Sequence, residues 1–232
     1  NSKVNTTVVA MTIICIMLFM TITVLSSGLG INHSFRESLM ELTPVDVDEE
    51  YLPPSGESAG TPVTDKLQDA GFDLHVLQDD YVEMGIYSTG QLTMGLTLGE
   101  NMSEVSKKFM FLSAELEEDI VRLSDYNRLA KLYGNAQYDL KDDEYLVLCN
   151  MDDVKIQRDK MLKKGEKIQL DGISYWPKYR ECQDGFLQMM TNRINPGIYV
   201  FPDHAVKEEW RNRGFLAADY ARQDKKGVED AD

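Results

Sequence analysis

One serine lies in a pattern that hydrolytic enzymes use. Residues Gly56–Gly60 read Gly-Glu-Ser-Ala-Gly, which matches G-x-S-x-G with Ser58 as the nucleophile. This chemistry needs the serine on a strained turn between a buried strand and a helix. The acidic residues and two prolines that precede Gly56 cannot form a buried parallel strand. The sequence therefore favours a flexible loop over a catalytic serine.

Histidines and cysteines could bind a metal ion or serve as a base. His33 lies on an expected stalk helix, and neither His75 nor His204 has a histidine four residues away. Cys149 and Cys182 are 33 positions apart, which is not the spacing of a clustered zinc site. We expect no metal site and no cofactor. Two unpaired structural thiols are favoured, with a disulfide between Cys149 and Cys182 as the alternative.

Phosphate-binding and calcium-binding patterns are weak. No segment has the form G-x-x-x-x-G-K-[ST], and the segment Gly165–Lys167 ends a predicted helix instead of opening one. The acidic clusters Asp142–Glu144 and Glu115–Asp119 lack the loop spacing of calcium ligands. We interpret both clusters as solvated acidic surface. The sequence thus predicts no catalytic residues and no enzyme activity.

The charge distribution argues against a nucleic-acid partner. The 232 residues include 24 Lys and Arg against 39 Asp and Glu, which gives a net charge of -15. Residues 1–45 are neutral overall, so the whole excess lies in residues 46–232. Binding to a phosphate backbone needs a basic face. With 43% hydrophobic residues, the chain can nevertheless bury the core of one domain or two small ones.

A long apolar segment lies near the start of the chain. Thr6–Leu25 contains no charged residue, glycine or proline. As a helix, this segment would span about 30 Å, the thickness of a bilayer core. We interpret it as a transmembrane helix, with a signal peptide or a buried soluble helix as alternatives. After this segment, apolar residues at helical spacing lie on one face, namely Ile31, Phe35, Leu39 and Leu42. We therefore expect a transmembrane helix and stalk over residues 1–42.

The rest of the chain predicts an acidic linker and a mixed domain. Residues 43–60 have many carboxylates and a Pro/Gly cluster, which is typical of a linker or an edge segment. Residues 61–232 alternate short helices and strands, which predicts an α+β domain. Helices are expected over 61–70, 124–133, 152–163 and 205–213, strands over 81–89, 119–123, 144–149, 186–190 and 197–201, and a hairpin over 167–176.

Three of these expectations concern individual residues. Ser124 should cap the helix that follows it, because its hydroxyl could accept an N–H of the first turn. The hairpin should turn at Asp171-Gly172, the strongest hairpin signal in the chain. The aromatic pairs in Tyr175-Trp176 and Tyr199–Phe201 should lie in the core, with an aromatic contact surface as the alternative.

Several segments together resemble a known family. The chain is similar to FtsX-like ABC transporter permeases of the bacitracin-resistance (Bce) type. The resemblance covers most of the chain, and its landmarks are Ser2–Thr6 joined to the apolar run, Leu123–Asn127, Leu140–Leu146, Leu170–Tyr175 and Ile198–Asp203.

This resemblance implies a fragment of a permease subunit in the cell membrane, with the residues after the helix outside the cell. A separate ABC ATP-binding subunit would drive transport, and a sensor histidine kinase is a further possible partner. The ligand would be an antimicrobial peptide or a peptide–lipid complex, with no contact residues assigned. The alternatives are a single-pass sensor ectodomain and a membrane-anchored surface enzyme.

Overall fold

A computed structural model describes residues 16–23, 26–27, 45, 47–52, 81–187 and 195–218. The chain divides into two compact units, residues 1–43 and residues 44–232. Several expected features lie outside the described residues, namely the stalk after residue 30, the helix over 61–70, Cys15, His33, Ser58 and His75.

The described part of the first unit is helical. The hydroxyls of Thr21 and Thr23 donate to the carbonyls of Met17 and Phe19, each at 2.8 Å, so these polar side chains are satisfied one turn earlier. Among the described residues, no helix has both the length and the apolar character that crossing a bilayer requires. By its length, the described helix does not support the expected transmembrane helix and stalk over residues 1–42.

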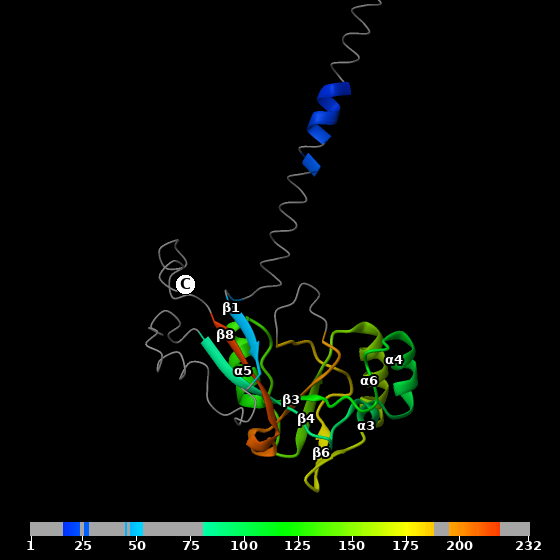
Figure 1. Cartoon of the computed structure of the whole chain (residues 1–232), viewed down its shortest axis with the longest axis vertical. Coiled ribbons are helices and arrows are strands. Elements are labelled where there is room, and N and C mark those ends of the chain that lie inside the picture. The colour runs from blue at the N-terminus through cyan, green and yellow to red at the C-terminus, as the bar shows by residue number, and fades with distance from the viewer. Residues whose placement is uncertain are drawn as a thin grey trace, which may run out of the picture. The chain divides into compact units, whose positions relative to one another are not determined.

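The second unit is built on an eight-stranded mixed sheet, which confirms the α+β class (Figure 1). The strand order is β1-β8-β2-β3-β7-β4-β6-β5. Neighbours are antiparallel except for the parallel pairs β3–β7 and β4–β6. The strands are β1 Val47–Tyr51, β2 Tyr81–Tyr87, β3 Asp119–Arg122, β4 Glu144–Leu148, β5 Ile168–Leu170, β6 Ile173–Pro177, β7 Ile198–Phe201 and β8 Arg211–Ala218.

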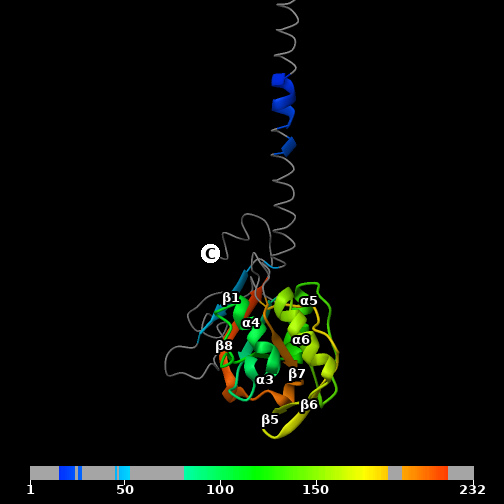
Figure 2. The ribbon, with the colours of Figure 1, turned by 90° about the vertical axis from the view of Figure 1, so that its right-hand side faces the viewer.

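Helices cover both faces of this sheet. The helix α5 (Leu123–Leu132) covers one face; α3 (Met94–Leu98), α4 (Met102–Lys108) and α6 (Asp152–Lys164) cover the other. Figure 2 shows the second group of helices in front of the sheet. The core is divided into two clusters, one on each face of the sheet. Successive side chains along β4 point to opposite faces and therefore belong to different clusters. Leu146 and Leu148 pack with the α5 cluster, whereas Val147 and Cys149 pack with the other.

Local signals identified several elements correctly. The hairpin of β5 and β6 turns at Asp171 and Gly172, whose φ angles are 50° and 80°. Both residues have positive φ, which this tight turn requires. The helix α6 ends at Gly165 with φ 71°, where glycine carries no steric penalty. The strands predicted from 81, 119, 144 and 197 are present as β2, β3, β4 and β7.

One predicted element near the end of the chain was wrong. The segment 205–213 is not a helix but two 3₁₀ turns, Asp203–Ala205 and Glu208–Trp210, followed by β8. This strand lies between β1 and β2, and residues 214–218 are all buried, so the alternation that marks a half-exposed strand is missing. Another strand was predicted over 186–190; Phe186 and Leu187 are not in a strand, and residues 188–190 lie outside the described residues.

The predicted cap of α5 was also wrong. The helix begins at Leu123, and no side chain of its N-cap residue forms a capping hydrogen bond. The backbone N–H of Ser124 instead donates to the Asp203 carboxylate at 3.0 Å. A carboxylate in this place satisfies an unpaired N–H and complements the positive end of the helix dipole. The cap therefore comes from a residue distant in sequence.

Candidate functional site

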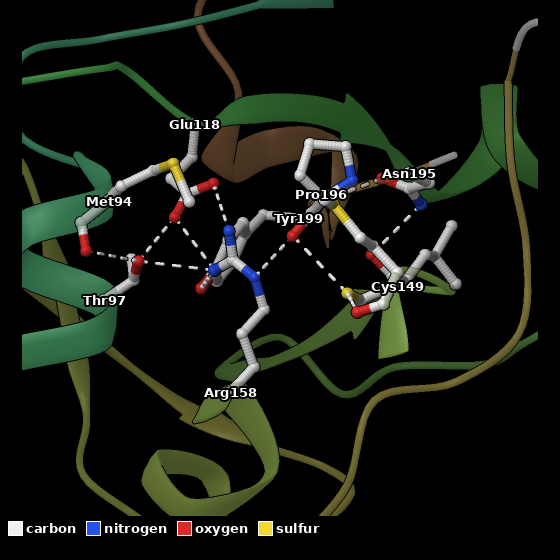
Figure 3. Close-up of polar contacts among 11 residues, drawn as sticks. Met94, Thr97, Glu118, Cys149, Arg158, Asn195, Pro196 and Tyr199 are labelled. Carbon is white, nitrogen blue, oxygen red and sulfur yellow. Dashed lines mark hydrogen bonds and ion pairs between the residues drawn. The ribbon is translucent and has the colours of Figure 1, made fainter. Parts of the chain in front are cut away.

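A guanidinium group is buried between α6 and the sheet (Figure 3). Arg158 donates to both carboxylate oxygens of Glu118, at 2.9 and 2.8 Å, and both side chains are at most 3% exposed. It also donates to the Tyr199 hydroxyl at 2.8 Å and to the Pro196 carbonyl at 2.7 Å. The Thr97 hydroxyl donates to Glu118, so α3, α6 and β7 meet at this cluster.

These contacts leave no group of the cluster available for chemistry. Burial alone would lower the pKa of Arg158, but the Glu118 carboxylate outweighs this effect and raises it. Burial raises the pKa of Tyr199 well above its ordinary value, although Arg158 opposes this shift. The guanidinium therefore stays charged and the phenol neutral. We interpret the cluster as a buried ion pair that fixes how the helices pack on the sheet.

A small cavity reaches this cluster from the surface. Its volume is about 60 Å³, and Thr97, Arg158 and Tyr199 are among the residues that line it. This space holds a few water molecules but no substrate of ordinary size. The ion pair is thus not the base of a ligand-binding pocket.

A larger, open cavity lies where β4 ends, and we call it the Tyr138 cavity. Its volume is about 450 Å³, within the range typical of ligand sites. Segments from the end of α5, the end of β4 and the loop after β6 form its walls. The lining residues are Asn135, Ala136, Tyr138, Asn150, Gln183, Asp184, Gly185 and Phe186.

Hydrogen bonds and ring contacts hold these walls in place. The Asn127 side chain bonds both the N–H and the carbonyl of Tyr138, at 2.9 and 2.7 Å. The Tyr138 hydroxyl donates to the Asp184 carbonyl at 2.9 Å, which joins two walls. Phe186 stacks on Tyr133 with the ring centroids 5.2 Å apart. The cavity is therefore formed before any ligand binds.

Two polar groups have unused bonding capacity, one in the lining of the Tyr138 cavity and one packed behind that lining. The Asp184 carboxylate is exposed and forms no hydrogen bond or ion pair within the described part of the chain. The Tyr126 hydroxyl is buried behind Gly185 and has no hydrogen-bond partner among the described residues. A Cβ atom on Gly185 would lie 2.3 Å from that hydroxyl, so close packing here requires glycine. The cavity offers aromatic rings, amides and one free carboxylate.

The residues singled out from the sequence are scattered. The cluster Glu115–Asp119 is not wholly solvated, because Glu118 pairs with Arg158 and Asp119 pairs with Arg213. Tyr175 and the whole segment Tyr199–Phe201 are buried, whereas Trp176 is 47% exposed. Cys149 and Cys182 are free thiols, both buried. Within the described ranges, no group of three His, Cys, Asp or Glu side chains could hold a metal ion.

The sequence did contain a signal for Arg158 that was missed. Val154, Arg158 and Leu162 are four residues apart, and all three are buried on one face of α6. An arginine on an otherwise apolar helix face indicates a buried charge that needs a partner. The Tyr138 cavity has no comparable signal, because its walls come from three separate segments.

The chain was compared with protein-family models, with curated proteins and with solved structures. None of the three comparisons found a match.

Proposed function

We propose that this chain is the membrane-anchored recognition part of a permease subunit that resembles the FtsX-like, bacitracin-resistance type. The second unit would bind an antimicrobial peptide or a peptide–lipid complex outside the cell. A separate ABC subunit would hydrolyse ATP, and a sensor histidine kinase would be a further partner.

The observation that carries the membrane anchor is the exposure of apolar side chains on the first helix. These side chains are 56% to 70% exposed and point in every direction around the helix; they are Ile16, Met17, Leu18, Phe19, Met20 and Ile22. A helix that is apolar all round is stable only when lipid or other helices surround it. The continuous apolar run from Thr6 to Leu25 extends this character over a bilayer thickness.

The Tyr138 cavity supports the recognition role and is its proposed site. Among the described residues that line it, the only charged one is Asp184, and the chain as a whole carries -15. A negative field attracts cationic ligands at a distance but is screened beyond about 8 Å at physiological salt. Fixed contacts must therefore add selectivity, and the preformed rings and amides of the cavity supply them.

The first experiment removes the folded unit from the full-length permease. Residues 47–218 are replaced by a short Gly/Ser linker, which the pairing of Val47 with Ala218 allows. Resistance to the peptide should vanish while basal ATP hydrolysis by the partner subunit persists. Undiminished resistance would refute the recognition role, whereas loss of ATP hydrolysis as well would show an assembly defect.

The second experiment tests the Tyr138 cavity with charge reversal. Asp184→Lys changes an exposed carboxylate in its lining, and Asp142→Lys makes the same change in net charge at another exposed position. Binding of cationic peptides, with and without vesicles that carry wall-precursor lipid, should weaken about tenfold only for Asp184→Lys, as expected for a lost charge contact. Equal weakening in both variants would assign binding to the general field and not to the cavity.

A further inference from the structure

Two buried thiols lie on the same face of two paired segments at the end of β4, diagonally across a parallel bridge. Leu148 and Gln183 form a parallel bridge. The Cys149 N–H donates to the Gln183 carbonyl at 3.2 Å, and the Gln183 N–H donates to the Val147 carbonyl at 2.8 Å. Side chains alternate along both segments, so Cys149 and Cys182 project to the same face, opposite to Leu148 and Gln183. Both cysteines belong to the core cluster on that face.

Each thiol has a charged neighbour on α6. The Cys149 Sγ lies 3.4 Å from the Pro196 carbonyl, which also accepts a bond from Arg158, as Figure 3 shows. The Cys182 N–H donates to the Asp159 carboxylate at 2.7 Å. Arg158 and Asp159 are adjacent on the helix, so this single turn of α6 shares the Pro196 carbonyl with Cys149 and binds the backbone of Cys182.

We propose that Cys149 and Cys182 are a modification site, a dithiol that forms a reversible intramolecular disulfide by exchange with a disulfide reagent or a disulfide-carrying protein. Two thiols lose two protons and two electrons and form one S–S bond, and the reagent disulfide is reduced to two thiols. The two residues are oxidised together, and no metal or other cofactor takes part. The proposal does not depend on which ligand the domain recognises.

The surroundings of the pair tolerate both states. On oxidation the Pro196 carbonyl loses the Cys149 thiol but keeps the Arg158 Nε–H at 2.7 Å. Asp159 keeps the Cys182 N–H and the ammonium group of Lys155 at 3.0 Å. No buried acceptor is left without a donor, so oxidation does not incur the usual cost of an unsatisfied polar group.

The environment also distinguishes the two sulfurs. A hydrogen bond from the Cys182 thiol lowers the pKa of Cys149, and Arg158 lowers it further. The same hydrogen bond and burial raise the pKa of Cys182. Because the thiolate is the attacking species, Cys149 is the nucleophile. Both side chains are buried, so exchange requires opening of the segment around Cys182 and is slow.

A disulfide here would act on the Tyr138 cavity. It would join the end of β4 directly to the segment Gln183–Phe186, which forms one wall of the cavity. The contacts that now hold this wall include the Leu148 bridge, the Tyr138 hydroxyl, the Asn195 amide and the stacking of Phe186 on Tyr133. A covalent link to β4 would restrict the opening of this wall. It would also stabilise the folded domain, because it closes a loop in the unfolded chain.

The test uses the full chain in a mild non-ionic detergent, with Cys15→Ser to leave two thiols. One sample is incubated folded with excess glutathione disulfide, and a second is refolded in it. Free thiols are then alkylated and peptides are mapped by mass spectrometry. We expect the Cys149–Cys182 peptide pair, its release by dithiothreitol, and a thermal midpoint about 10 °C higher in the oxidised form.

Three outcomes would overturn the proposal. They are the absence of the linked peptide by both routes, glutathione adducts on separate cysteines in place of the link, and a linked form that melts below the reduced form. The variants Cys149→Ser and Cys182→Ser should each lose the link without lowering the helix content measured by circular dichroism. Alkylation of the remaining thiol in each variant controls for access.

Discussion

The buried ion pair between Arg158 and Glu118 makes a quantitative prediction about stability. Arg158→Met removes the guanidinium but keeps an unbranched apolar side chain in place of the aliphatic stem on α6. Glu118 would then remain 3% exposed with only the Thr97 hydroxyl as a partner. Removing one member of a buried pair costs about 3 to 5 kcal/mol. Since a domain has about 5 to 15 kcal/mol of stability in total, this loss would be a large fraction.

The double variant Arg158→Met/Glu118→Leu separates the ion pair from simple packing. It leaves no buried charge, and apolar replacements of buried pairs are often neutral. The Tyr199 hydroxyl and the Pro196 carbonyl still lose one bond each, which costs about 1 kcal/mol per bond. We therefore expect the double variant to recover to within about 2 kcal/mol of the parent, so that the two substitutions are strongly non-additive.

Urea unfolding of residues 44–232 measures these differences. This segment should be soluble and unfold cooperatively, because it forms one compact unit. Lys164→Met is the control, since Lys164 pairs with Glu100 at the surface and should leave the midpoint unchanged. The reasoning fails if Arg158→Met costs less than about 1 kcal/mol, or if the two core substitutions are additive.

Three further predictions concern other parts of the chain. Asp203→Ala should destabilise residues 44–232 by about 1 kcal/mol through loss of the α5 cap, whereas Ser124→Ala should have little effect; the reverse order in urea unfolding would contradict the observed cap. Burial acts to raise the pKa of Asp159, but hydrogen bonds from Cys182 and Lys155 outweigh it and hold this pKa below its ordinary value of 3.8. The stabilisation by Asp159 should therefore be present at neutral pH and disappear as the pH falls through this lowered pKa, so Asp159→Asn and the parent should converge in acid unfolding profiles but differ near pH 7; a constant difference would contradict the shift. Ile16→Asp should cost about 3 kcal/mol of insertion free energy and move the full chain from the membrane fraction to the soluble fraction; identical fractionation would argue against the anchor.

The fold class was predictable because its signals are local. The turn at Asp171-Gly172 and the end of α6 at Gly165 depend on backbone conformations that few residues adopt. By contrast, β8 is buried by two neighbouring strands that are distant in sequence, and α5 takes its cap from Asp203. No short window of sequence contains these partners. The walls of the Tyr138 cavity are non-local in the same way.

The sheet also determines where the folded unit connects to the rest of the chain. Val47, near the start of β1, lies opposite Ala218, at the end of β8, because the two strands are antiparallel and in full register. The entry and exit points are therefore separated by about one strand spacing, near 5 Å. Among the described strands, edge strand β1 pairs with β8 alone, and its hydrogen bonds to β8 lie perpendicular to the chain.

Mechanical load at these two points would act in a peeling direction. If the entry and exit points were pulled apart, the hydrogen bonds between β1 and β8 would break one after another, starting from Val47, and would not share the force. A strand pair that is peeled apart in this way resists much less force than a strand pair that is pulled along the direction of the strands. Small movements of whatever holds the two ends would thus detach β1 first and leave the remaining seven strands intact.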